Sequence, residues 1–169
     1  MRTLYLLRHA KSSWSDPALD DVDRPLAPRG ERAAKRMAKE LRRKQVRPEL
    51  VLCSSSLRTR QTLAAIEPSL GGECVVELEP RLYAASEAEL LDRLRAVPEA
   101  VGSVMLIGHN PGLQDLALAL ASRGAALAEL VAKFPTGALA TLALHSADWA
   151  SLSPGDAELV DYVVPRELG

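Results

Sequence analysis

The chain has 169 residues, of which 47% are hydrophobic and 25% charged, close to an average soluble protein. This length indicates a single domain, residues 1–169, whose core needs no metal or disulfide support. Two cysteines exclude a disulfide framework, and a net charge of −1 excludes a strongly basic nucleic-acid-binding protein. Since no apolar run predicts a signal peptide or membrane span, we expect a cytoplasmic protein that binds neither membranes nor nucleic acid.

The charges are unevenly distributed along the chain. Residues 1–60 contain 15 Lys and Arg against 7 Asp and Glu, a net charge of +8, whereas residues 61–169 have a net charge of −9. One interpretation is a solvated basic helix in an arginine-rich sequence. The other is that part of the N-terminal excess faces an anionic substrate.

The N-terminal half predicts two strands, each followed by a helix. The apolar runs over 2–7 and 50–53 are typical of buried strands. A long polar loop from 9 to 28 separates the first strand from a helix that begins at Pro28, and loops of this length are often functional. One apolar stripe on this helix contains Ala33, Ala34, Met37, Ala38 and Leu41. Serines 54–56 offer an N-cap for the second helix, over 57–70.

The C-terminal half continues the alternation of strands and helices. Strands are predicted over 74–78, 103–107, 138–145 and 159–164, and helices over 87–97 and 113–121. Such alternation is typical of an α/β three-layer sandwich, in which a mainly parallel central sheet is flanked by helices.

Residues suited to binding an anion follow three of these strands. Arg8 and His9 follow the first, Arg58 lies shortly after the second, and His109 follows the strand over 103–107. Because ligands of such sheets bind beyond the carboxyl ends of the strands, we expect these side chains to converge at one edge. The third histidine, His145, ends a late strand, and we expect it to be structural or on the surface.

These residue types suit phosphoryl transfer. A guanidinium group can bind two oxygens of one phosphate at once. A neutral imidazole is a competent nucleophile at neutral pH. Zinc binding is the rival use of two histidines, but no Cys, Asp or Glu adjoins them at ligand spacing. We therefore predict neither a metal nor a cofactor.

The motifs carrying these residues resemble those of the histidine phosphatase superfamily, which includes the phosphoglycerate mutases. The resemblance rests on Arg8-His9-Ala10, on Arg58 within SSSLRTRQT, and on His109 within GHNPG. The opening RHAKSSW, the segment GHNPGLQDLA and the short length are similar to the SixA-type branch, the phosphohistidine phosphatases. The resemblance spans residue 4 to about residue 121 and implies a phosphoglycerate mutase-like fold.

The resemblance also implies roles for individual residues. His9 would be the nucleophile that becomes phosphorylated. Arg8, Arg58 and His109 would hold the phosphoryl oxygens, with His109 partly or wholly cationic in the loaded pocket. The family pattern selects Arg58 over Arg60, since Arg58 lies three residues before the Gln-Thr pair.

Four further residues are candidates for the substrate pocket. Ser15 stands where mutases often carry a phosphate-contacting Asn, and Asn110 follows the second histidine. We include both in the predicted substrate-binding set. Lys11 and Trp14 are candidates for the rim, or else a solvated lysine and a partly buried tryptophan.

The chain departs from the family where a proton donor is expected. Mutase-type members carry a glutamate at the position of Pro80, and acid-phosphatase members carry an aspartate at the position of Asn110. Glu79 and Asp16 are alternative donors, or else surface carboxylates. The SixA-type branch is similar in lacking an evident acid.

The sequence thus predicts a metal-independent phosphatase that forms a covalent phosphohistidine on His9. Its partner would be a phosphorylated protein, dephosphorylated at histidine, or a small phosphorylated substrate. Two alternatives are a general phosphomonoesterase acting on small metabolites and a non-catalytic module that binds a phosphorylated ligand. The intact His9 counts against the module, because a binding protein has no use for a nucleophile.

Overall fold

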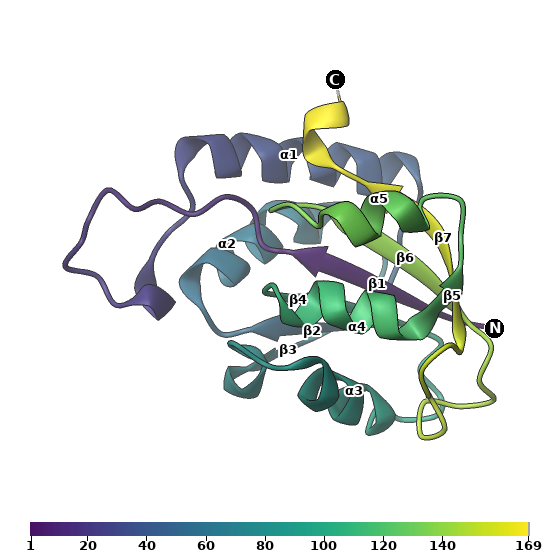
Figure 1. Cartoon of the computed structure of the whole chain (residues 1–169). Coiled ribbons are helices and arrows are strands. Elements are labelled where there is room, and N and C mark those ends of the chain that lie inside the picture. Colours follow the sequence, from purple (N-terminus) through teal and green to yellow (C-terminus); the bar gives the residue numbers. More distant parts are fainter. Residues whose placement is uncertain (169) are drawn as a thin grey trace.

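The centre of the structure is a seven-stranded sheet with helices on both faces, shown in a computed structural model that describes residues 1–168 (Figure 1). The strands are β1 (Arg2–Arg8), β2 (Leu50–Ser54), β3 (Val75–Glu79), β4 (Ser103–Gly108), β5 (Ala121–Arg123), β6 (Leu139–Leu144) and β7 (Ala157–Val163). The α-helices are α1 (Pro28–Arg43), α2 (Leu57–Ile66), α3 (Glu87–Arg95), α4 (Gly112–Leu120) and α5 (Leu127–Ala132). None of the helices in residues 1–168 combines the length and the apolar character needed to cross a membrane.

The strand order places the expected site residues on neighbouring strands. The order is β3-β2-β4-β1-β6-β7-β5. Strands β1, β2, β3 and β4 run parallel, as do β5 and β7, whereas β6 is antiparallel to both of its neighbours. The predicted α/β fold around a mainly parallel sheet is therefore confirmed.

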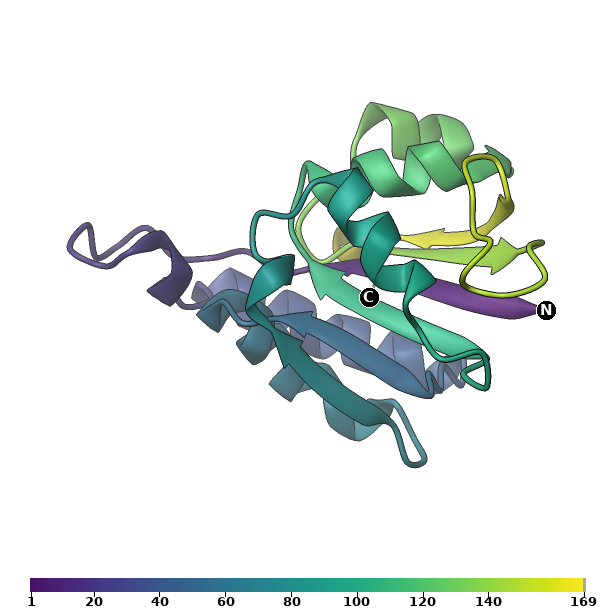
Figure 2. The ribbon, with the colours of Figure 1, turned by 90° about the horizontal axis from the view of Figure 1, so that it is seen from below.

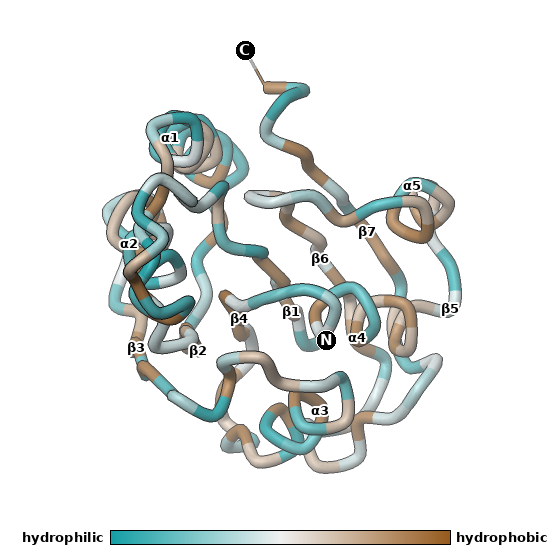
Figure 3. The backbone as a smooth tube through the Cα atoms, turned by 60° about the vertical axis from the view of Figure 1, so that its left-hand side comes forward, coloured by the Kyte–Doolittle hydropathy of each residue, from teal (hydrophilic) through white to brown (hydrophobic). Residues whose placement is uncertain are grey.

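The central strands of the sheet are buried on both faces, whereas the edge strand β3 is largely exposed. In β1, Leu4 and Leu6 pack in a core with α3, α4 and α5, whereas Leu7 packs with α1 and α2. Alternate side chains of a strand point to opposite faces, so one strand supplies both cores. Figure 2 shows the two helix layers on either side of the sheet, and Figure 3 views the sheet between them. This is the predicted three-layer sandwich.

Helix α1 forms where the sequence predicts it. Pro28 occupies its first turn, where the missing N–H leaves no hydrogen bond unmade. Met37, Ala38 and Leu41 are buried against the sheet, Ala34 is buried against Ala10 and Leu26 of the loop that precedes the helix, and Ala33 is only half-buried. The rest of the helix surface is strongly basic.

The structure differs from the prediction mainly between residues 120 and 138. The helix expected to end at residue 121 ends at Leu120, because the next three residues pair with β7 as the short strand β5. Helix α5 follows in a segment for which the sequence predicted no element. At the other end of the chain, α2 stops at Ile66, and the 3-10 helix Glu67–Ser69, which contains Pro68, replaces its expected last turn.

The loop from residue 9 to residue 27 projects away from the sheet (Figures 1 and 2). It contains the 3-10 helix η1 (Asp21–Asp23). Its base is fixed by close packing, because a Cβ atom added at Gly30 of α1 would lie 2.0 Å from the carbonyl oxygen of Lys11. The N–H of Gly137, at a φ of +78° that favours glycine, donates to the carbonyl oxygens of Arg8 and His9.

Candidate active site

The two site histidines meet because their strands are parallel neighbours. Arg8 at the end of β1 pairs in register with Gly108 at the end of β4, so His9 and His109 leave the sheet side by side. The N–H of His9 donates to the carbonyl oxygen of Gly108 at 3.1 Å. The two imidazole rings lie 5.3 Å apart between centroids.

A cavity of about 270 Å³ opens above these residues. Its lining consists of Arg8, His9, Lys11, Ser12, Trp14, Arg24, Arg58, His109, Asn110 and Thr136. Four of these side chains are cationic, and no carboxylate of residues 1–168 belongs to the lining. A larger cavity of about 580 Å³, between residues 64 and 74, contains no histidine. Residue chemistry rather than volume therefore identifies the candidate site.

The hydrogen bond of His9 fixes which of its nitrogens is free. The ring is buried, and Nδ1 lies 2.7 Å from the carbonyl oxygen of Ala10. A carbonyl oxygen can only accept, so Nδ1 carries the proton and Nε2 keeps its lone pair. Burial, reinforced by the nearby cations, lowers the pKa of His9 to about 3. The ring is therefore neutral near pH 7, as a nucleophile must be.

His109 is also neutral near pH 7. Burial, followed by the charge of Arg58, lowers its pKa to about 4. Its Nε2 lies 2.8 Å from the hydroxyl oxygen of Ser54, at the end of β2. The resemblance implies a cationic His109 only in the loaded pocket, where a phosphoryl dianion would favour the charged ring.

The two arginines that the sequence predicts for the site, Arg8 and Arg58, are engaged in hydrogen bonds, yet each retains an unused donor. Nη1 of Arg8 donates to the carbonyl oxygen of Phe134 at 3.0 Å. Nη1 and Nη2 of Arg58 donate to the carbonyl oxygen and the carboxylate of Asp21, at 2.7 and 3.0 Å. The Nε atoms of Arg8 and Arg58 are buried and have no hydrogen-bond partner among residues 1–168. Buried donors without an acceptor are uncommon in folded proteins, and an incoming anion would supply the acceptor.

Arg58, which the family pattern selects, and Arg60, which it does not, lie in different surroundings. Arg58 is 6% exposed and lines the cavity. Arg60 is exposed, lies outside the cavity lining, and donates from Nε to the carbonyl oxygen of Ser55 at 3.0 Å. The position of Arg58 is held by Thr62, whose hydroxyl donates to the Arg58 carbonyl and accepts from the N–H of Ala10. Helix α2 thereby couples Arg58 to the segment that carries His9.

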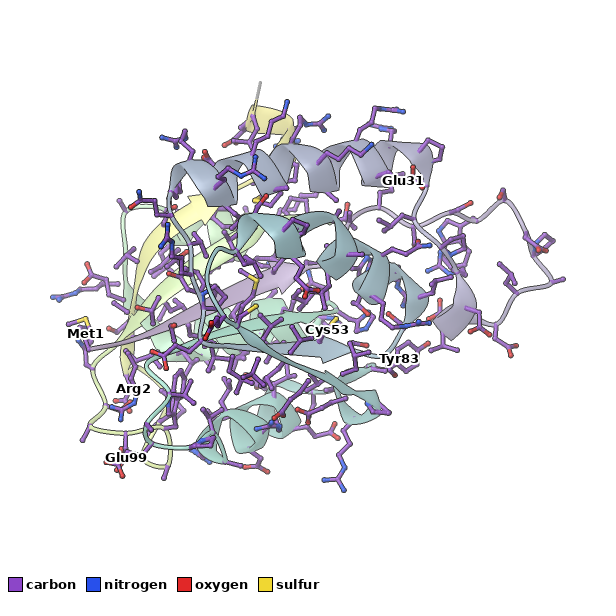
Figure 4. All side chains as sticks on the ribbon, turned by 180° about the vertical axis from the view of Figure 1, so that it is seen from behind. Met1, Arg2, Glu31, Cys53, Tyr83 and Glu99 are labelled. Atoms are coloured by element: carbon purple, nitrogen blue, oxygen red, sulfur yellow. The ribbon has the colours of Figure 1, made fainter. Side chains whose placement is uncertain are left out.

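Sequence reasoning missed a polar network beside Arg58. The carboxylate of Asp21 accepts hydrogen bonds from Arg58, Arg24 and the hydroxyl of Tyr83. These bonds, that of Tyr83 above all, hold the pKa of Asp21 well below its ordinary value. Figure 4 shows Tyr83 at the end of the molecule from which the loop projects. The run of charged residues in an unusually long loop was the available signal.

Sequence reasoning also missed Arg24 as a residue that lines the cavity. Arg24 is 7% exposed and lines the cavity, and its guanidinium donates to the Ser12 hydroxyl and to the carbonyl of Ser13. It also stacks on the ring of Trp14, with 3.4 Å between the guanidinium carbon and the ring centroid. Trp14 itself is 75% exposed, so it forms part of the cavity rim rather than the core.

Of the remaining sequence-predicted residues, some line the cavity and others lie outside it. Lys11 and Asn110 line the cavity, although the Asn110 amide is already bonded to the Phe134 carbonyl and to the N–H of Gln114. Ser15 is exposed, bonds to Ser13, and does not belong to the lining, whereas Ser12 does. His145 lies exposed at the far end of β6.

Neither alternative proton donor belongs to the cavity lining. Glu79 is bound to Arg93, with 2.8 Å between the carboxylate and Nε. Asp16 is exposed in the loop and accepts from the N–H of Ala18. Asp21 is close to the site, but its low pKa keeps it ionised, so it holds no proton to donate. Residues 1–168 contain no group of three or more His, Cys, Asp or Glu side chains placed to bind a metal ion.

Comparison with known proteins agrees with this geometry. Residues 4–90 match the sequence profile of the histidine phosphatase superfamily, branch 1. An uncharacterized protein of Mycobacterium tuberculosis is 39% identical over 95% of this chain and 100% of its own length. The phosphohistidine phosphatase SixA of Escherichia coli is 34% identical over 64% of this chain and 67% of its own.

A solved structure resembles the whole fold. The putative phosphohistidine phosphatase SixA from Nakamurella multipartitia superposes with a TM-score of 0.83 and 34% identity, covering 97% of this chain and 96% of its own. The sequence profile matches the stretch that carries the Arg-His motif of β1 and Arg58 of α2, and the superposition extends to the strand that carries His109. This chain belongs to the histidine phosphatase superfamily, in its SixA-type branch.

Proposed function

We propose that this protein hydrolyses phosphohistidine on a protein substrate through a covalent phosphohistidine intermediate at Nε2 of His9. The observation that carries the proposal is the bond from Nδ1 of His9 to the Ala10 carbonyl, at 2.7 Å. It directs the free lone pair of a neutral imidazole into a cavity lined with cations. The resemblance to phosphohistidine phosphatases supports the substrate.

The reaction has two steps that the site residues would carry out in turn. In the first, Nε2 of His9 forms a bond to phosphorus while the bond from phosphorus to the substrate imidazole breaks. In the second, water attacks the same phosphorus, and His9 leaves with its lone pair restored. Arg8, Arg58 and His109 would hold the three non-bridging oxygens in both steps. They supply the positive charge on these oxygens, so the proposal includes no metal.

Among residues 1–168, no carboxylic acid belongs to the cavity lining, and this favours phosphohistidine over an ordinary phosphate ester. An alkoxide is a poor leaving group, and its departure typically gains about 100- to 10,000-fold from a positioned proton donor. The imidazole of phosphohistidine can take a proton from solvent and leave as a neutral amine. Pro80 and Asn110 stand where relatives place the acid, while Glu79 is bound to Arg93.

The experiment compares three substrates in one assay: a phosphohistidine peptide, p-nitrophenyl phosphate and a sugar phosphate. We expect kcat/KM to fall in that order, because the need for a proton donor rises in that order. Glu79→Gln and Asp16→Asn should keep the order, since neither side chain belongs to the cavity lining.

Two outcomes would overturn the proposal. Efficient hydrolysis of the sugar phosphate that collapses in either carboxylate variant would make the protein a general phosphomonoesterase. Binding of phosphate without turnover of any substrate would make it a binding module. The cytoplasmic location and a physiological protein substrate stay predictions.

A further inference from the structure

A second cationic cavity adjoins the active site and takes no part in the chemistry proposed above. This basic groove, of about 370 Å³, is lined by Lys11, Arg29, Arg32, Ala33, Arg36, Lys133, Pro135, Thr136, Val164, Pro165 and Arg166. Six of the eleven residues are cations, and no carboxylate of residues 1–168 belongs to the lining. Lys11 and Thr136 also line the active-site cavity, so the two cavities are contiguous.

Four separate chain segments build the basic groove. Helix α1 contributes residues 29, 32, 33 and 36, which lie on one helix face because their spacings are three and four residues. The C-terminal 3-10 helix η4 (Pro165–Glu167) contacts α1 and forms a further wall, and Figure 1 shows the C-terminal segment beside α1. Thr136 immediately precedes Gly137, whose N–H holds the carbonyls of Arg8 and His9. The groove is therefore fixed relative to the nucleophile.

The cations of the basic groove are unpaired, unlike many others in the molecule. None of the six forms an ion pair with a carboxylate of residues 1–168. By contrast, Arg43 pairs with Glu40, and Lys44 on the same helix end pairs with Asp161. The Nε atom of Arg36 is buried without a hydrogen-bond partner in the described part of the chain. A cluster of unpaired like charges is unfavourable until an anion neutralises it.

The form of the basic groove indicates what kind of anion it binds. Five of its six cations are exposed, and they are distributed over several elements. A site for a single phosphate instead has buried donors that converge on one point, as the donors of Arg8 and Arg58 do in the active-site cavity. No aromatic side chain of residues 1–168 lines the groove, so it lacks the stacking surface that single-stranded nucleic acids use. Exposed, spread-out cations suit several carboxylates on a protein surface, because such contacts select partners by charge.

We propose that the basic groove docks a carboxylate-rich segment of the phosphorylated protein, next to the phosphoryl group in the active-site cavity. This inference rests on the proposed function, which supplies the protein substrate. It gives the N-terminal excess of positive charge a role in substrate selection, the second interpretation offered by the sequence. Lys11, which lines both cavities, would mark the boundary between docking and chemistry.

Two phosphohistidine peptides test the proposal, one with six glutamates flanking each side of the phosphohistidine and one with glutamines there. Six extended residues span about 20 Å, enough to reach a contiguous groove from the cavity. The groove variant is Arg29→Gln/Arg32→Gln, and the matched control is Lys35→Gln/Lys39→Gln. All four side chains are exposed on α1, and only the first two line the groove.

We expect wild type and control to prefer the glutamate peptide by about tenfold in kcat/KM at low salt, a modest value for electrostatic attraction. The groove variant should lose this preference and hydrolyse the glutamine peptide as fast as wild type. Salt at about 0.5 M should abolish the preference in every protein. Lys133→Gln/Arg166→Gln, in other walls of the groove, should repeat the loss.

Other results would overturn the docking inference. An equal rate on both peptides in wild type would do so while leaving the proposed function intact. If the groove variant and the control lost the preference for the glutamate peptide equally, the preference would depend on net charge rather than on the groove. A groove variant impaired on the glutamine peptide would assign these arginines to the chemistry.

A binding measurement separates failure of docking from failure of the proposed function. A fluorescein-labelled hexaglutamate peptide without phosphate should bind wild type and control more tightly than the groove variant, whether or not the protein turns over phosphohistidine. Equal binding to all three proteins would contradict docking. An oligothymidylate that displaces the peptide at lower concentration than free hexaglutamate would make nucleic acid the ligand instead.

Discussion

The active-site cavity and the basic groove are contiguous cationic surfaces, but they hold their cations in opposite ways. In the cavity, Arg58 and Arg24 are 6% and 7% exposed, and both are bound by Asp21. In the groove, Arg29 and Arg32 are exposed and form no ion pair within residues 1–168. Buried, fixed donors stabilise charge that develops during the reaction, whereas exposed charges attract and select binding partners. We therefore expect cavity substitutions to act on kcat and groove substitutions on KM.

The largest effect should come from His9. His9→Ala should abolish turnover and leave the fold intact. The only other imidazole in the cavity lining formed by residues 1–168 is that of His109, which follows β4 rather than β1 and so cannot take the place of His9. Incubation with a labelled substrate followed by alkaline denaturation should leave base-stable, acid-labile phosphate on wild type and none on His9→Ala. His145→Ala, at an exposed histidine outside the cavity, is the control and should behave as wild type. Turnover in His9→Ala would refute the covalent mechanism.

The next largest effect should separate two arginines on one helix. Arg58→Lys should lower kcat by about 100- to 1,000-fold, the usual cost of removing one preorganised donor to developing charge. A lysine ammonium carries no planar fork, so it cannot bond to Asp21 and to a phosphoryl oxygen as the guanidinium can. Arg60→Lys should keep nearly full activity, because Arg60 lies outside the cavity lining. The reverse result would assign the phosphoryl contact to Arg60.

A smaller effect should come from Asp21, which touches Arg58 without lining the cavity. Asp21→Asn removes the charge that holds Arg58 and Arg24, and small misplacements of catalytic groups cost up to about 100-fold. We expect a loss of about tenfold in kcat with little change in KM, which identifies Asp21 as a positioning residue. Tyr83→Phe should show a weaker version of the same loss, since it removes one bond to Asp21. A rise in kcat/KM would mean instead that Asp21 competes with the substrate for Arg58.

The strand-end residues could be predicted from the sequence, since they depend on local pattern and sheet geometry. The buried runs ending at Arg8 and Gly108 predict parallel strands, and parallel strands bring His9 and His109 to one edge. Asp21 could not be predicted, because it reaches Arg58 only through the fold of a 19-residue loop organised around Arg24.

The basic groove could not be predicted either, for a related reason. Its walls come from residues 11, 29–36, 133–136 and 164–166, and only the tertiary fold brings them together. The sequence showed the excess of positive charge in the N-terminal part, but not which surface of the folded protein carries it. Strand β5 was missed because three residues carry little pattern, and its pairing with β7 decides its conformation.

The smallest expected effect concerns stability rather than rate, and it follows from the neutral state of the two cavity histidines. Burial lowers the pKa of His9 to about 3 and of His109 to about 4, against an ordinary value of 6.5. Between pH 6.5 and about 4 the unfolded chain therefore binds protons that the native protein does not. The free energy of unfolding should fall as the pH falls through this window, and this contribution should level off below the native pKa values.

Urea unfolding at pH 7 and at pH 4.5 measures this contribution. Carboxylates also contribute to acid sensitivity, so the informative quantity is the difference in free energy between the two pH values, compared among proteins. We expect His9→Asn/His109→Asn to show a smaller difference than wild type, because asparagine takes up no proton in the unfolded chain. His145→Asn, at an exposed position, should keep the wild-type difference. An unchanged difference in the double variant would mean that the pKa values of both cavity histidines are the same in the native protein as in the unfolded chain, which would contradict their lowering by burial.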